Sequence, residues 1–137
     1  MPIRVVLVDD DRKTRETLID LLERESDIEV IAEAADGQSG LLLVRDVNPD
    51  VVVMDVFMPQ INGIQATGSI ASQHPGTKVI LLSMGYEKVF VDYLFRIGAS
   101  GFILKTNVSS ELASAIHKVM EGRTFRGKGV GYYLGEV

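Results

Sequence analysis

The chain has 137 residues, of which 46% are hydrophobic and 24% are charged, and it contains no cysteine. This composition is typical of one globular domain and excludes a disulfide framework or a thiolate metal centre. The net charge of −5 opposes direct binding to nucleic-acid phosphates.

Short apolar runs alternate along the chain with longer stretches in which apolar residues recur every three or four positions. This alternation predicts strands separated by helices. The five predicted strands span residues 4–8, 29–34, 51–55, 78–83 and 101–104. Several are apolar on both faces, which favours a sheet covered by helices on each side.

Five segments between and after these strands have helical periodicity. Their apolar stripes are Leu18, Leu21 and Leu22; Leu41, Leu42 and Val44; Ile64 and Ile70; Val89, Phe90, Tyr93, Leu94 and Ile97; and Leu112, Ile116, Val119 and Met120. Asp36 is placed to start the second helix, and the third is expected over residues 63–73, before His74-Pro75-Gly76. Gly98 and Gly122 are placed to end the fourth and fifth helices.

The five β-α units predict an α/β fold with a doubly wound, five-stranded parallel sheet, because right-handed crossovers return each helix to the sheet. Residues 1–122 are expected to form this domain. Residues 123–137, with Gly-x-Gly-x-Gly at 127–131, are expected to be a C-terminal tail or linker. Phe125, Tyr132 and Tyr133 are candidates to pack back on the domain or on a partner.

Polar residues follow the predicted strands at one end. Asp9 and Asp10 follow the first strand, Asp55 ends the third, Ser83 ends the fourth and Lys105 follows the fifth. Functional groups of doubly wound sheets collect at the carboxyl ends of the strands, so we expect these five side chains to meet at one edge.

Three carboxylates at one edge repel one another, and a divalent cation removes that problem. Mg²⁺ prefers oxygen ligands, so Asp10 and Asp55 suit it directly, with Asp9 acting directly or through water. Held in this way, Asp55 stays ionised and can act as a nucleophile that yields an aspartyl phosphate. Lys105 would supply a positive charge, and the Ser83 hydroxyl would donate to a phosphate oxygen.

Each of these residues also has a structural interpretation. The aspartates could cap the first helix, which is the preferred interpretation for Asp11, and Asp55 could be an isolated turn residue. Ser83 could be a small strand-end residue, Lys105 a solvated charge and Phe102 a core residue. His74 and His117 are interpreted as surface residues without metal-ligand spacing.

The ordered motifs VVLVDDD at 5–11, VVVMDVFMPQINGIQA at 51–66, VILLS at 79–83 and GFILKT at 101–106 resemble a response-regulator receiver domain. The resemblance covers about residues 3–122. It implies the flavodoxin-like receiver fold with strand order 2-1-3-4-5. It also implies that a sensor histidine kinase or a small phosphodonor phosphorylates Asp55 in a Mg²⁺-dependent reaction catalysed largely by the receiver, which is not otherwise an enzyme.

The same resemblance assigns further roles. The backbone carbonyl of Phe57 would join Asp9, Asp10 and Asp55 as a metal ligand, and Ser83 and Phe102 would form the switch. Lys105 matches the family's lysine. Phosphate on Asp55 would draw Ser83 inward and vacate space for Phe102, changing the face formed by the fourth helix, fifth strand and fifth helix.

Three positions depart from the usual receiver pattern. Met84 is bulkier than the small residue usual after the switch hydroxyl and would crowd the phosphate or its donor. Thr106 replaces a common proline, as in the subgroup whose regulators carry a C-terminal helix-turn-helix DNA-binding domain. Phe57 is apolar where rapidly dephosphorylating members carry a polar side chain, so we expect a comparatively long-lived phosphoryl group.

Two rival functions stay open at the level of sequence. The first is a pseudo-receiver that binds partners without being phosphorylated. The second is a Mg²⁺-dependent phosphatase with an aspartyl nucleophile, although a dehalogenase-like member would carry a second Asp where Phe57 stands.

A two-component regulator is the favoured interpretation. We expect it in the cytoplasm, because no apolar run approaches the length of a membrane span. Its expected partners are a sensor histidine kinase and, through the face that changes, a second copy in a possible homodimer. No membrane contact is expected, and DNA would be bound only through a further domain absent from this chain.

Overall fold

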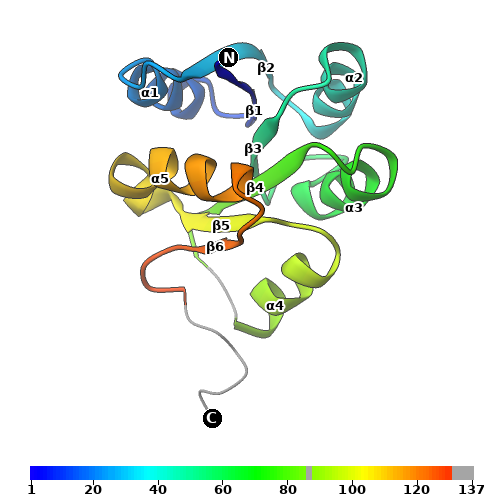
Figure 1. Cartoon of the computed structure of the whole chain (residues 1–137). Helices are drawn as coiled ribbons and strands as arrows, with labels where there is room; N and C mark the ends of the chain where they lie inside the picture. Colours follow the sequence, from blue (N-terminus) through cyan, green and yellow to red (C-terminus); the bar gives the residue numbers. More distant parts are fainter. Residues whose placement is uncertain (86–87, 131–137) are drawn as a thin grey trace.

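The structure is a computed structural model that describes residues 1–85 and 88–130, and Figure 1 shows how its elements are arranged. The strands are β1 (Ile3–Val8), β2 (Ile28–Ala34), β3 (Val51–Asp55), β4 (Lys78–Ser83), β5 (Gly101–Leu104) and β6 (Phe125–Arg126). The helices are α1 (Arg12–Leu22), α2 (Gly37–Val47), α3 (Gly63–Gln73), α4 (Lys88–Arg96) and α5 (Val108–Met120), with a short 3₁₀ helix η1 (Lys105–Asn107).

The strands form one parallel sheet of order β2-β1-β3-β4-β5-β6. The predicted order 2-1-3-4-5 is confirmed, but the sheet has six strands rather than five. The additional strand comes from the segment expected to be a tail, where Phe125 and Arg126 pair with Gly101 and Phe102. A two-residue strand is too short to show alternation, so hydrophobic periodicity could not reveal it.

Helices cover both faces of the sheet, as the two-sided apolar strands predict. Figure 1 shows α1 and α5 on one face, with α2 and α3 on the other and α4 near the β5 end. Side chains alternate along each strand, so β3 sends Val51 and Val53 towards α1 and α5 and sends Val52 and Met54 into the opposite core. All five residues of β3 are buried, including Asp55 at its end.

The stripe predicted for α2 is partly wrong. Leu42 is 45% exposed, whereas Gly37, Gly40 and Val44 form the buried face of the helix. A Cβ on Gly40 would lie 2.8 Å from a methyl group of Val8, so a glycine lets α2 approach β1 closely. Glycine has no hydrophobicity that a periodic pattern could register, which explains the error.

The predicted bounds of α3 match the structure, and its start fixes the path of the chain after Asp55. Asn62 and Gln65 form a reciprocal capping box at the N-terminus of α3. The amide of Gly63 donates to the carbonyl of Val56 at 2.8 Å. The β3–α3 connection is therefore held at both of its ends, next to the carboxylate of Asp55.

Candidate functional site

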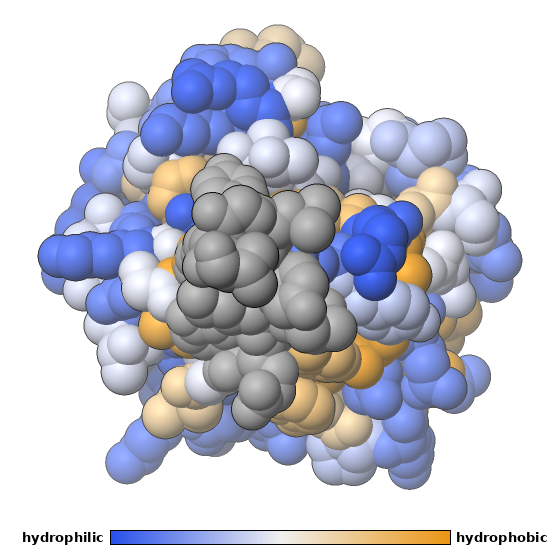
Figure 2. All heavy atoms as spheres, turned by 90° about the horizontal axis from the view of Figure 1, so that it is seen from below, coloured by the Kyte–Doolittle hydropathy of each residue, from blue (hydrophilic) through white to orange (hydrophobic). Residues whose placement is uncertain are grey.

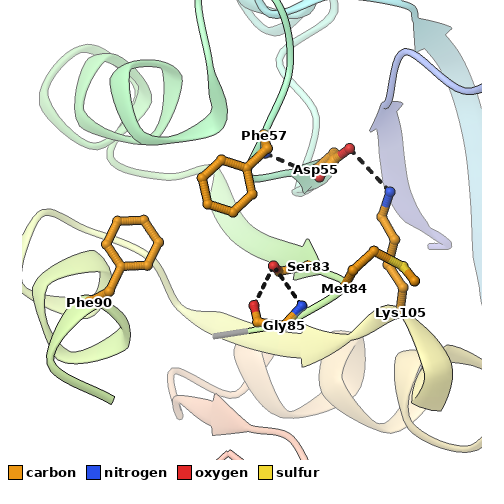
Figure 3. A pocket seen from close by; sticks show the side chains of 7 residues that line it. All are labelled: Asp55, Phe57, Ser83, Met84, Gly85, Phe90 and Lys105. Atoms are coloured by element: carbon orange, nitrogen blue, oxygen red, sulfur yellow. Dashed lines mark hydrogen bonds and ion pairs between the residues drawn. The ribbon is translucent and has the colours of Figure 1, made fainter. Parts of the chain in front are cut away.

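The carboxyl ends of β1, β3 and β5 bring two acidic side chains and one amine together. The Nζ atom of Lys105 lies 3.0 Å from Oδ2 of Asp9 and 3.1 Å from Oδ2 of Asp55. The side chain of Asp9 is 1% exposed and that of Lys105 is 17% exposed, so solvent screens these contacts only weakly. Figure 3 shows Lys105 reaching towards Asp55 across the site.

Hydrogen bonds orient the carboxylate of Asp55. Its Oδ2 accepts from Lys105, while its Oδ1 accepts from the backbone N–H of Phe57 at 3.2 Å. Burial raises the pKa of Asp55 because it disfavours the charged form; Lys105 opposes this shift and the charge of Asp9 adds to it. Burial also disfavours the ammonium of Lys105, but its bonds to Asp9 and Asp55 outweigh that effect and raise its pKa.

A third carboxylate completes an oxygen-rich cluster at this edge. Asp9, Asp10 and Asp55 each offer an oxygen, and these three atoms lie within 4.8 Å of one another. Asp10 is exposed, whereas Oδ2 of Asp9 is buried and, among the described residues, is approached only by the Lys105 ammonium. One amine faces three carboxylates, so the cluster fits a hard divalent cation better than it fits further hydrogen-bond donors.

Ser83 lies beside this cluster, but its hydroxyl forms hydrogen bonds with the backbone of Gly85. Its hydroxyl donates to the carbonyl of Gly85 and accepts from the Gly85 amide at 3.3 Å. Ser83, Asp55 and Lys105 all line one open cavity of about 630 Å³. A phosphoryl group in that cavity would compete with Gly85 for the Ser83 hydroxyl.

The mouth of this cavity is apolar. Phe57 and Phe90 stack with ring centroids 6.1 Å apart and planes 10° from parallel, and Met84 completes the rim (Figure 3). We call Phe57, Met84 and Phe90 the apolar collar. Met84 is 74% exposed, so it stands at the mouth instead of filling the cavity. Periodicity predicts that Phe90 lies in a core stripe, and Phe90 does pack against the core, but only the fold reveals that it also borders the site.

The other candidate residues lie in structural settings. Phe102 is fully buried in the core that α2, α3 and α4 share. Asp11 occupies the N-cap of α1, where hydrogen bonding, chiefly from the Thr14 hydroxyl at 2.6 Å, lowers its pKa. His117 is not isolated, because its Nε2 lies 2.8 Å from a carboxylate oxygen of Asp27, a contact between residues far apart in the chain that no periodic pattern predicts.

A five-unit β-α sheet with buried aspartates and a lysine at its carboxyl edge defines a receiver module of the kind used in signalling. The family model described as the response regulator receiver domain matches residues 5–117. The chain belongs to this family.

Curated relatives carry regulatory names. The chain is 38% identical to the transcriptional regulatory protein LiaR of Bacillus subtilis, an alignment that covers 88% of this chain and 57% of LiaR. It is 35% identical to the transcriptional regulatory protein DegU of Brevibacillus brevis, covering 90% of this chain and 52% of DegU. The chain therefore spans about half the length of these relatives.

Solved structures agree with the fold. A two-component response regulator of the LuxR family from Aurantimonas sp. SI85-9A1 superposes with a TM-score of 0.86 at 35% identity, covering 91% of this chain and 89% of that one. The signal receiver domain of the putative response regulator NarL from Mycobacterium tuberculosis gives 0.85 at 33% identity, covering 89% and 98%. Within the part of the chain that the structure describes, no helix is long and apolar enough to cross a membrane.

Proposed function

We propose that this chain is the phosphorylation-controlled switch of a two-component transcriptional regulator and that Asp55 accepts the phosphoryl group. The observation that carries the proposal is the convergence of Lys105 on Asp55 and Asp9 at 3.1 and 3.0 Å, beside an open cavity. A buried strand that ends in a carboxylate holds its nucleophile rigidly, and phosphoryl transfer depends mostly on such positioning.

In the proposed reaction, a carboxylate oxygen of Asp55 attacks the phosphorus of the donor. An O–P bond forms, the bond between phosphorus and the donor's leaving atom breaks, and the leaving group departs with that electron pair. Lys105 lies where it can neutralise charge on the transferred group, and Ser83 can donate to one of its oxygens. The Phe57 amide holds the other carboxylate oxygen of Asp55.

The same residues fit a resident Mg²⁺ ion. Asp9, Asp10 and Asp55 would hold it through their carboxylates, with the backbone carbonyl of Phe57 as a further ligand that family membership suggests. When bound, the ion supplies charge neutralisation on the phosphoryl oxygens.

Ser83 is the first element of the proposed switch. Binding to a phosphoryl oxygen would take its hydroxyl from Gly85 and so alter the β4–α4 connection. Phe102 is already buried while Ser83 still bonds to Gly85, so inward rotation of its ring is not required for burial. Phosphorylation shifts the equilibrium only if the phosphoryl group interacts better with the second arrangement.

The proposed phosphodonor in the cell is a sensor histidine kinase. The proposed output is control of transcription by a longer regulator that binds DNA through a further domain. A second copy of this chain is a further proposed partner, in a homodimer. Support for this output comes from the regulatory names of the relatives, of which this chain spans about half.

The function is tested by incubating the chain with Mg²⁺ and a small acyl phosphate and measuring the intact mass. A gain of one phosphoryl group that is lost in Asp55→Asn and greatly reduced without Mg²⁺ supports the proposal. No gain with this donor or with a phosphorylated kinase domain would instead indicate a pseudo-receiver. Repeated turnover with release of inorganic phosphate would indicate a phosphatase.

A further inference from the structure

The segment after α5 is bonded to the receiver sheet. We call residues 123–130 the C-terminal strap. The amide of Phe125 donates to the carbonyl of Ser100, and that of Gly127 to the carbonyl of Phe102, each at 2.9 Å. Val130 is 4% exposed and belongs to the same core cluster as Phe102. In Figure 1 the strand β6, which lies in the strap, runs beside β5 at the edge of the sheet.

One side chain joins the strap to α4. The Nη2 of Arg126 lies 2.7 Å from Oδ1 of Asp92, and the two side chains are only 11% and 14% exposed. The same guanidinium lies 4.5 Å from the ring centroid of Phe95, one turn further along α4. Removing one partner of a shielded ion pair that also makes a cation–π contact costs more than removing one partner of an exposed surface pair.

The other side of the strap is held by residues near the site. Glu111 of α5 accepts a hydrogen bond from the amide of Lys128 at 2.7 Å, and the side chain of Asn107 donates to the carbonyl of Lys128 at 3.2 Å. Asn107 lies in η1, which begins at Lys105. A Cβ on Gly127 would come within 2.8 Å of Glu111 and 3.2 Å of the Phe102 carbonyl, so the strap fits closely here.

The opposite end of α4 reaches the candidate site. Phe90, in the first turn of α4, stacks on Phe57, which is two residues from Asp55. The helix is thus attached at its N-terminal end to the loop that follows Asp55 and, through Asp92 and Phe95, to the strap. Seen from the strap side, hydrophilic side chains dominate the rim of the molecule and apolar ones form separate patches nearer the middle (Figure 2).

We propose that the contacts of Arg126 with Asp92 and Phe95 couple the C-terminal strap to α4, so that displacement of α4 breaks these contacts and loosens the strap. The direction of the effect rests on the proposed function. A phosphoryl group that draws Ser83 away from Gly85 alters the connection that leads into α4, separates Asp92 from Arg126 and loosens the strap.

The coupling is tested in the unphosphorylated full chain by hydrogen–deuterium exchange of Arg126→Ala and Asp92→Asn. Each substitution should speed exchange roughly tenfold both in the strap, at the amides of Gly127 and Lys128, and in α4. The double variant should add little to Arg126→Ala, because Arg126→Ala already removes the pair with Asp92. Arg123→Ala is the matched control, since Arg123 makes only an exposed pair with Glu121 at 3.5 Å among the contacts described for it.

Faster exchange in the strap alone, with α4 unchanged, would overturn the coupling, as would no change in either segment. Arg126→Lys guards against a general loss of folding, because it keeps the charge and loses the planar stacking on Phe95. It should loosen both segments by less than Arg126→Ala does. Additive effects of Arg126→Ala and Asp92→Asn would also contradict a single shared link.

The direction is tested in wild-type protein whose phosphorylation is measured by mass in the same sample. If the phosphoryl group is present, faster strap exchange supports release, and unchanged or slower exchange overturns it. If no phosphoryl group is gained, the proposed function fails and with it the direction, while the coupling is still decided by the variants.

Discussion

Lys105 provides the positive charge nearest to two buried carboxylates. Replacing it with methionine would leave Asp9 and Asp55 close together and without that neutralisation. We expect Lys105→Met to lower the free energy of unfolding by on the order of 1–3 kcal/mol in the absence of Mg²⁺. Adding Mg²⁺ should recover more stability in this variant than in wild type, because the cation replaces the lost charge.

Urea unfolding with and without Mg²⁺ measures both effects. Arg24→Met is the control, because Arg24 is exposed and distant in sequence from the site, and it should show neither effect. Equal stabilisation of Lys105→Met and wild type by Mg²⁺ would contradict a shared role of lysine and cation in neutralising the cluster.

Phe57 is expected to prolong the life of the phosphoryl group. Its ring is 61% exposed at the rim of the cavity and offers no polar atom that could orient an attacking water. Phe57→Asn should therefore shorten the half-life of phosphorylated protein several-fold, because the Asn amide can orient an attacking water. The rate is measured by following the loss of phosphate over time by intact mass.

Phe57→Leu is the control, because it keeps an apolar side chain without stacking on Phe90, and it should lose phosphate at nearly the wild-type rate. Equal rates in wild type, Phe57→Asn and Phe57→Leu would refute a role of Phe57 in prolonging the life of the phosphoryl group.

At the scale of single residues, the sequence could predict the strand-end groups because the carboxyl ends of parallel strands share one edge. That rule predicts that Asp9, Asp55 and Lys105 lie together, as they do. It could not predict the Asp92–Arg126 pair or the stacking of Phe57 on Phe90. Such contacts join elements far apart in the chain, and they leave no periodic pattern.

Among the elements, α3 offers a matched comparison of two glycines. A Cβ on Gly63 would lie 2.5 Å from the backbone oxygen of Asp55, whereas one on Gly68 would have nothing within 4 Å. We expect Gly63→Ala to destabilise the fold by about 1–3 kcal/mol and to slow phosphorylation, because the backbone at Asp55 must shift. Gly68→Ala should stabilise it by up to about 1 kcal/mol. Urea unfolding midpoints and phosphorylation rates test both, and effects of the same sign would be inconsistent with this geometry.

The start of α2 should make stability depend on pH. The Asp36 carboxylate accepts from the backbone N–H of Ser39 at 2.7 Å and from its hydroxyl at 3.1 Å, and these bonds lower the pKa of Asp36. A lowered folded-state pKa means that the cap stabilises the fold above the unfolded-state pKa, about 3.9, and that this stability is lost as the pH falls through the lower folded value. The stability difference between wild type and Asp36→Ala should therefore shrink on acidification.

Asp36→Asn is the control, because it keeps an accepting oxygen that does not titrate. It should lose less stability than wild type over the same pH interval. A stability difference between wild type and Asp36→Ala that does not depend on pH would argue against the cap.

At the scale of elements, boundary signals succeeded where they were strong. His74-Pro75-Gly76 marked the end of α3, and the predicted bounds of that helix are correct, although the Asn62 cap at its start was not part of the prediction. The predicted stripe of α2 was misplaced because its buried face is built from two glycines and one valine. The strand β6 escaped prediction because its two residues are held by β5 and α4 and have no pattern of their own.

For the whole molecule, family membership and fold were predictable from the order of the motifs, whereas the contacts of residues 123–130 were not. Residues 123–130 pair with β5, bury Val130 and bind α4, so we propose that the folded unit extends at least to residue 130 instead of ending at 122. Tyr132 and Tyr133, also predicted to pack back, lie outside the described residues. The glycines at 127 and 129 suggested a flexible linker. The contacts of the neighbouring residues Phe125, Arg126 and Lys128 with β5 and α5 instead hold this segment against the domain.

The most direct measurement locates the phosphoryl group within the chain. Phosphorylated protein is treated with borohydride, which reduces an aspartyl phosphate to homoserine, and the modified peptide is sequenced by mass spectrometry. We predict homoserine at position 55 and unmodified aspartate at positions 9 and 10, with no reduction in Asp55→Asn. Homoserine at position 9 or 10, or retention of the phosphoryl group by Asp55→Asn, would contradict the assignment of Asp55 as the acceptor.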